Sequence, residues 1–142
     1  SNGTVWGSMF VKGLVIGQGH LFIVIQGNFD VSLGKIWGTQ FGINNSDADT
    51  DTGMIADTVY RIVWRYDFYE AQGRKCDAYL WVNPDLSEEP NVSTANASKT
   101  GVNWSPSNVI EIQAQQFGDQ RYMIDEFFLG DTFRSIVPVL NE

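Results

Sequence analysis

An acidic loop holds the first residues whose spacing could do chemistry. Residues 45–53 read NSDADTDTG, so Asp47, Asp49 and Asp51 alternate with small or polar residues. Ca²⁺ takes several oxygen ligands, and alternating carboxylates in a flexible loop can converge on one ion. The spacing imitates the first three ligands of an EF-hand loop, but the twelfth residue counted from Asp47 is Thr58, where that loop has glutamate. The loop is therefore either a Ca²⁺ site of another class or a solvated turn.

Aromatic residues beside polar segments form a second candidate site. Sugar recognition needs exposed rings that stack on pyranose faces, with amides or carboxylates nearby for the hydroxyls. Trp37, Phe41 and Trp104 lie in or beside Gly- or Ser-rich segments and are the candidate carbohydrate-binding residues. The alternative for Trp37 and Trp104 is burial at the rim of the core. Trp64 and Trp81 have apolar neighbours and are expected inside it.

The residue types of common catalytic sites occur here without the spacing that catalysis needs. A glycosidase needs two carboxylates flanking one bond. Asp125 and Glu126 are adjacent and would face opposite sides of a strand, with Glu111 expected on the neighbouring strand. The only histidine, His20, is expected at the surface beside a strand start, and the only cysteine, Cys76, as a buried packing residue that excludes an internal disulfide. We therefore expect no enzymatic activity.

Five N-x-S/T sequons point to the outside of the cell. Their acceptors, candidate glycosylation sites, are Asn2, Asn44, Asn91, Asn96 and Asn103. The motif is the acceptor of N-glycosylation in secreted proteins. No charged and then apolar leader opens the chain, so any signal peptide is expected outside these residues. The sequons favour an extracellular or cell-surface location.

The charge balance narrows the class of partner. Among 142 residues, 17 Asp and Glu against 9 Lys and Arg give a net charge of −8. Such a chain has too few cations to neutralise phosphates in quantity, so nucleic acid and anionic membranes are not expected as partners. No apolar run approaches the ~20 residues that a membrane-spanning helix needs. The expected partners are a glycan or neighbouring protein subunits or domains.

A long hairpin between Thr58 and Pro84 is the element around which the others are expected to be arranged. Large apolar side chains fall on every second residue of its first strand: Tyr60, Ile62, Trp64, Tyr66 and Phe68. A period of two places them on one face of a strand and Arg61 and Arg65 on the other. A polar, Gly-containing loop at 70–75 precedes a second β-favouring run at 79–82. The pattern predicts an antiparallel hairpin whose aromatic face forms a wall of the core.

Short β-favouring runs separated by turn residues fill the rest of the chain. Strands are expected at 4–12, 21–25, 29–37, 38–43, 109–117 and 121–130. The last two are expected to pair as a second hairpin, and residues 85–105 to form a long polar connection. Because no long segment carries a 3.6-residue period, the sequence predicts one all-β domain spanning 1–142, an antiparallel two-sheet β-sandwich.

Five segments, in this order, resemble the laminin-G-like jelly rolls of the concanavalin A-like lectin/glucanase superfamily, of the bacterial surface or secreted type. They are TVWGSMFVKG, LGKIWGTQFGI, ADTVYRIVWRYDF, YLWVNPDLSEEP and MIDEFFLGDTF. The resemblance implies a concanavalin A-like jelly roll with an accessory role in carbohydrate binding, adhesion or structural packing. Ca²⁺ binding occurs across lectin-like sandwiches, which favours the acidic loop as a metal site. The resemblance by itself does not imply catalysis.

One departure from the resemblance leaves two function hypotheses. Such domains usually have further strands before the segment equivalent to Thr4, and a sandwich without them would leave a sheet edge open. The first hypothesis is a non-catalytic extracellular carbohydrate-binding or adhesion module, with Ca²⁺ as its one candidate cofactor. The alternative is a structural subunit of an extracellular assembly or filament, joined through open sheet edges.

Overall fold

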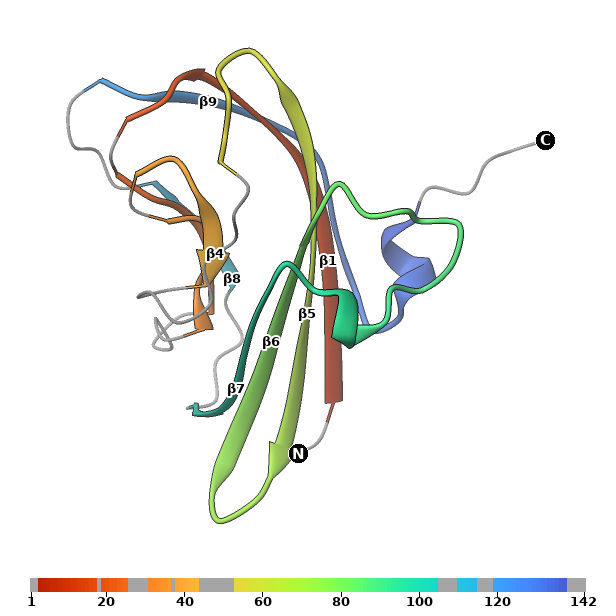
Figure 1. Ribbon diagram of the computed structural model, residues 1–142. Coiled ribbons are helices and arrows are strands. Elements are labelled where there is room, and N and C mark those ends of the chain that lie inside the picture. The colour runs from red at the N-terminus through yellow and green to blue at the C-terminus, as the bar shows by residue number, and fades with distance from the viewer. Residues whose placement is uncertain are drawn as a thin grey trace.

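The computed structural model describes residues 3–17, 19–25, 31–36, 38–43, 53–104, 110–114 and 119–137. In this part of the chain, strands form two antiparallel sheets, shown in Figure 1. The strands are β1 (Gly3–Val15), β2 (Leu21–Ile25), β3 (Leu33–Lys35), β4 (Phe41–Ile43), β5 (Val59–Glu70), β6 (Arg74–Val82), β7 (Ala97–Asn103), β8 (Ile110–Ala114) and β9 (Arg121–Gly130). The large sheet has the order β7-β6-β5-β1-β9, and the small sheet has the order β4-β3-β2-β8. The all-β prediction is confirmed.

The predicted central hairpin is confirmed as β5 and β6. The two strands pair antiparallel from Ile62 opposite Val82 to Glu70 opposite Arg74. Ile62, Trp64 and Tyr66 are fully buried on one face, which we call the inner face of the large sheet. The side chains between them lie on the opposite, outer face. The alternation of side chains in the sequence therefore correctly predicts which residues of β5 lie on each face.

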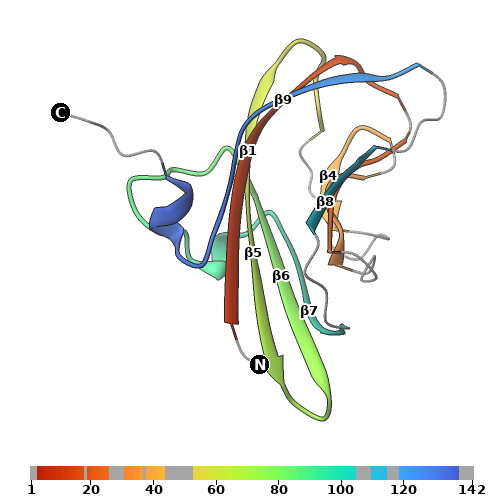
Figure 2. The same cartoon turned by 180° about the vertical axis from the view of Figure 1, so that it is seen from behind.

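The two sheets enclose one hydrophobic core between them. Figures 1 and 2 show the small sheet lying against the inner face of the large sheet, beside the upper part of β5. Both sheets contribute buried side chains to one cluster, including Ile23, Leu33 and Phe41 from the small sheet and Trp64 and Leu80 from the large one. Burying each such side chain contributes roughly 1.5–3 kcal/mol, so this cluster is the main source of stability.

A second, smaller cluster covers the middle of the outer face. It contains Trp6, Val63, Trp81, Phe133 and Ile136. Its cover is formed by the connection 83–96, which includes the short 3₁₀ helix η2 (Val92–Thr94), and by η3 (Phe133–Ile136). We call these two segments the cap. The Trp6 ring of β1 stacks on Trp81 of β6, with 5.7 Å between centroids, and contacts Phe133 of η3 at 5.4 Å, so the Phe133 ring attaches the cap to the sheet.

Two sequence predictions about strand pairing are wrong. Segments 109–117 and 121–130 do not form a hairpin, because β8 pairs with β2 in the small sheet and β9 pairs with β1 in the large one. A turn signal between two strands does not distinguish a hairpin from a crossover between sheets. The connection 85–105 also contains a strand, since β7 pairs with β6. Its sequence, ASKTGVN, is polar because an edge strand is held by backbone hydrogen bonds on one side alone.

No helix in the described residues is both long and apolar enough to span a membrane.

Candidate functional site

Several predicted site residues lie outside the described part of the chain. They are the Ca²⁺ candidates Asp47, Asp49 and Asp51, the ring candidate Trp37, and the sequon asparagines Asn2 and Asn44. Within the described residues, no group of three or more His, Cys, Asp and Glu side chains could hold a metal ion. Calcium binding therefore remains a prediction from the sequence.

The other two predicted sugar-binding rings pack into the core. Phe41 is 0% exposed and lies 5.1 Å from the ring of Tyr60, so it offers no ring face to a sugar. Trp104 is half-buried against Phe68, with 4.6 Å between the ring centroids. Phe41 is therefore no longer a candidate sugar-binding residue. Trp104 lies at the rim of the core, which was the alternative interpretation of this residue.

His20 lies inside the protein, which corrects the expectation of a surface position. Its side chain is 7% exposed, because it precedes β2, whose Leu21 and Ile23 point into the core between the sheets. Burial lowers the pKa of His20, and a hydrogen bond with the Gln113 side chain opposes that shift. Beside it, Lys35 is 1% exposed and its amine donates to the carbonyl of Gly19. Burial lowers the pKa of Lys35 to about 8.

The carboxylates considered for glycosidase chemistry do not form a pair. Glu111 belongs to β8 in the small sheet, whereas Asp125 and Glu126 belong to β9 in the large one. Glu126 sits at a bulge of β9 with φ 50°, and its backbone N–H donates to Asp125 Oδ1 at 2.8 Å. These contacts give the dipeptide a structural role in turning the edge strand.

Cys76 has the packing role that the sequence predicts. It is 0% exposed within the main core, and burial raises the pKa of its thiol to about 12. A thiol that stays protonated is a poor nucleophile. Cys76 is therefore a small apolar core residue.

The three described sequon asparagines are exposed, and each makes a local hydrogen bond. Asn91 caps η2 by accepting from Ser93 N, and Asn96 Oδ1 accepts from Val82 N at 2.8 Å. Asn103 Oδ1 accepts from Lys75 Nζ at 2.6 Å. All three therefore remain candidates for glycosylation and also order the surface around β6.

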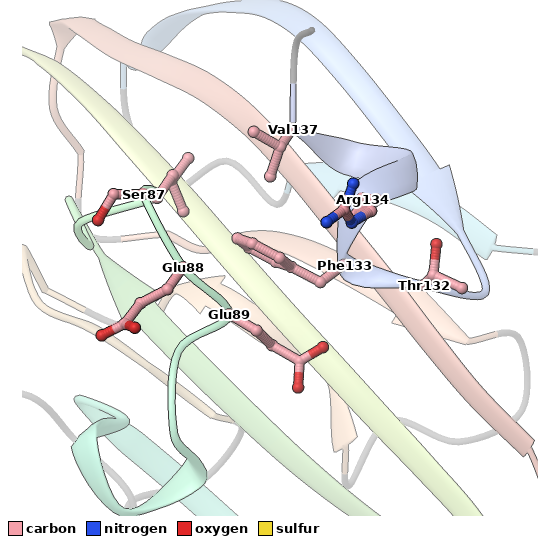
Figure 3. A pocket seen from close by; sticks show the side chains of 8 residues that line it. Ser87, Glu88, Glu89, Thr132, Phe133, Arg134 and Val137 are labelled. Atoms are coloured by element: carbon pink, nitrogen blue, oxygen red, sulfur yellow. The ribbon is translucent and has the colours of Figure 1, made fainter.

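A cleft of about 710 Å³ separates the two parts of the cap. Figure 3 shows Glu88 and Glu89 on the wall formed by the connection 83–96, with Thr132 and Arg134 on the wall beside η3. The ring of Phe133 lies between these walls and is 8% exposed. The cleft thus carries charges of both signs, but its single ring offers little surface to a ligand.

The outer face of the hairpin holds a denser group of charged and aromatic side chains. Its cross-strand pairs are Arg65 with Tyr79, Asp67 with Asp77, and Tyr69 with Lys75. All six side chains are half-buried, and we call them the polar hairpin face. Like charges directly opposite each other destabilise a sheet. The Asp67–Asp77 pair is therefore a feature that packing alone does not explain.

Hydrogen bonds hold both carboxylates in place through one oxygen each. Asp67 Oδ1 accepts from Arg65 Nε at 2.8 Å and from Thr4 Oγ1 at 2.9 Å. Asp77 Oδ1 accepts from Tyr69 Oη at 2.9 Å and from the backbone N–H of Gly101 at 2.7 Å. Within the described residues, neither Oδ2 has a hydrogen-bond partner. The face therefore presents two oriented acceptor oxygens to a ligand.

Two tyrosine rings stand on either side of these acceptors along the strands. The pKa of Tyr69 is raised by its hydrogen bond to Asp77, and that of Tyr79 is raised by burial and then by the carboxylates of Asp77 and Asp67. Both phenols therefore stay protonated donors near neutral pH. Rings beside fixed carboxylates are the combination that sugar recognition needs.

The sequence contains a signal for this face that the prediction did not use. The alternation that identifies the aromatic inner face also places Arg65, Asp67 and Tyr69 together on the other side of the strand. Asp77 and Tyr79 show the same spacing on the next strand. Only the register of the hairpin, however, brings Asp67 opposite Asp77.

Comparison with known proteins gives no match: no protein-family model, no curated protein and no solved structure is similar to this chain at a significant level.

Proposed function

We propose that this chain is a non-catalytic, extracellular carbohydrate-binding module with its sugar site on the polar hairpin face. The observation that carries the proposal is the opposed pair Asp67 and Asp77, bracketed by the rings of Tyr69 and Tyr79, each carboxylate with one oxygen that has no hydrogen-bond partner among the described residues. The rings would pack on the apolar face of a pyranose, and the carboxylates would accept from its hydroxyls. Arg65 adds a donor beside them.

The polar hairpin face supports this function better than the cap cleft does. Its tyrosines are half-exposed, whereas the cleft's Phe133 is 8% exposed. The two carboxylates also favour uncharged or amine-bearing sugars over acidic ones, because a glycan carboxylate or sulfate would be repelled. The negative charge of the whole chain acts in the same direction.

The same proposal includes the type of β fold and the extracellular location. Two antiparallel sheets around one core fit the laminin-G-like, concanavalin A-like jelly roll that the sequence resembles. Exposed sequon asparagines at Asn91, Asn96 and Asn103 support an extracellular location. Ca²⁺ at Asp47, Asp49 and Asp51 would then assist binding from a separate loop.

A glycan array probed with and without a chelator tests the function. We expect binding to neutral or amine-bearing glycans, lost in Tyr79→Ala and weakened roughly tenfold or more in Asp77→Asn, since an amide donor would replace the acceptor oxygen that faces the sugar hydroxyl. Tyr79→Phe keeps the ring and separates stacking from hydrogen bonding. Asp119→Asn, an exposed carboxylate on another part of the surface, is the matched control. Absence of glycan binding in both conditions would exclude the proposal.

The edges of the large sheet give less support to the alternative function, a structural subunit joined through open sheet edges. Its β9 edge carries the bulge at Glu126, and its β7 edge carries a second bulge at Gly101, where φ is 69°. Bulges twist an edge and interrupt the row of backbone groups that a new strand would need. We therefore place the edge-joined subunit second to the carbohydrate-binding module.

A further inference from the structure

An apolar patch occupies one end of the outer face, beyond the cap. Val59 is 55% exposed and Met123 is 56% exposed. With Phe10 and Lys12 they line a groove of about 420 Å³. Leu14, 39% exposed, continues this side of β1, and Ile55, 67% exposed, is held nearby because Asp57 N donates to Gly13 O. Large exposed side chains gathered on one surface usually mark an interaction site.

Strand register arranges the patch as two rows of three side chains. In the first row, Lys12 of β1 lies between Val59 of β5 and Met123 of β9. In the second row, Phe10 lies between Arg61 and Asp125. In strand register β1 therefore lies between Arg61 on β5 and Asp125 on β9, and the Arg61 guanidinium reaches over the Phe10 ring toward Glu126 of β9. We call these six residues the β1 patch.

The β1 patch is complementary to itself across a two-fold axis that runs along β1. Such an axis exchanges the β5 and β9 columns, so Arg61 of each copy faces Asp125 of the other. The same rotation places Val59 opposite Met123 of the other copy and brings the two Phe10 positions together, each ring with the Arg61 guanidinium of its own copy over it. The two Lys12 side chains meet at the axis, and their flexible ends can turn toward the acidic column. Apart from Lys12, the facing positions therefore pair opposite charges or apolar side chains.

The two basic side chains of the β1 patch are only weakly paired within the described residues, so they can bind a partner. The Arg61 guanidinium lies 4.4 Å from the centroid of Phe10 and 3.9 Å from Glu126, a long and partly exposed ion pair that is therefore weak. Lys12 has no ion pair within the described residues. Figures 1 and 2 show the upper ends of β1 and β9 curving away from η3, so the cap does not cover this end of the face.

We propose that a second copy of this chain docks on the β1 patch and forms a face-to-face homodimer. The interface is distinct from the sheet edges, because it uses side chains of the outer face rather than the backbone groups of β9. It is also separate from the polar hairpin face, with which it shares no residue. Two sugar sites in one dimer would raise the avidity for a multivalent glycan surface.

Sedimentation velocity over a concentration series tests the dimer. Wild type should sediment as a dimer, and Met123→Glu should be monomeric, since it would place a carboxylate against the apolar Val59 of the other copy. Arg61→Glu and Asp125→Arg should each weaken association roughly tenfold or more, and the double reversal should restore it, because the two charges exchange places. Arg121→Glu, on the same strand but outside the patch, should leave association unchanged.

Circular dichroism on each variant separates misfolding from loss of contact. A wild type that is monomeric at every concentration would overturn the proposal, as would a Met123→Glu variant that still dimerises. A double reversal that folds but fails to restore the dimer would overturn the two-fold arrangement. Glycan binding by monomeric Met123→Glu to a monovalent sugar should equal that of wild type, so the outcome is independent of the proposed sugar site.

Discussion

At the residue scale, the buried Lys35 is the side chain whose environment differs most from its usual one. Lysine is almost never fully buried without a paired charge. Here the residue is 1% exposed, and the hydrogen-bond acceptors of its amine in the described residues are the carbonyls of Gly19 and Ile36. Burial lowers its pKa to about 8 for this reason.

Lys35 makes stability depend on pH in a defined window. Below about pH 8 the amine is charged in both the folded and the unfolded chain, and the free-energy cost of burying that charge is fully present. Between about pH 8 and the unfolded pKa of about 10.4, the unfolded chain binds a proton that the folded chain does not. The free energy of unfolding should therefore rise across this window, by up to about 3 kcal/mol, relative to Lys35→Met.

Chemical denaturation of both proteins at several pH values measures this difference. The comparison with Lys35→Met matters because Cys76 and Tyr66, whose pKa values burial raises, act in the opposite direction at high pH in both proteins. A difference between the two proteins that does not change with pH would contradict the assignment.

Gly7 is a second residue whose role follows from one contact. A Cβ at this position would lie 2.1 Å from Trp64 Cε2, and Trp64 is 0% exposed and cannot move aside freely. Gly7→Ala should therefore destabilise the protein by about 1–3 kcal/mol in urea unfolding. Gly3→Ala in the same strand, where a Cβ meets nothing within 4 Å, should have little effect. Equal losses of stability in both variants would show that the effect arises from strand propensity and not from the clash with the Trp64 ring.

At the element scale, the cap is held to the large sheet by a few large side chains. Trp81 Nε1 donates to Thr94 Oγ1 at 3.1 Å, which fixes η2, and Ser8 Oγ donates to Ile136 O, which fixes η3. Most of the remaining attachment is apolar packing in the second cluster. The cap should therefore respond strongly to the loss of one ring.

Phe133→Ala tests this attachment. Phe133 is 8% exposed and contacts Trp6, so its truncation should cost about 3 kcal/mol in thermal or urea unfolding. Phe127→Ala is the matched control, because that ring is 37% exposed and should cost much less. A larger loss for Phe127 than for Phe133 would mean that the cap is not anchored by this cluster.

At the scale of the whole molecule, one core shared by two sheets predicts cooperative unfolding. Trp64 lies in the main cluster and Trp81 in the cluster under the cap, and Val63 of the second cluster is adjacent to Trp64 in β5. Tryptophan fluorescence and far-UV circular dichroism should therefore give the same midpoint in denaturant. Two separate midpoints would contradict the prediction of one domain over 1–142.

Sequence patterns predicted local features well and pairing partners poorly. Alternation identified the β5–β6 hairpin, its aromatic inner face and the burial of Trp64 and Trp81, because a period of two is a local property. Phe41 and His20 were misplaced because their polar neighbours indicate a surface, whereas their burial depends on a sheet that packs over them from elsewhere in the chain. The polar strand β7 was missed because an edge strand carries little apolar pattern.

The sequence by itself determined an acidic all-β chain, its central hairpin and the two faces of that hairpin. These follow from composition and from side-chain alternation, which no distant residue alters. The tertiary structure decided that β8 and β9 belong to different sheets, that Asp67 lies opposite Asp77, and that Arg61, Phe10 and Asp125 form one row. Strand order and register depend on contacts between residues far apart in the sequence, because they are determined by which apolar faces can be buried together.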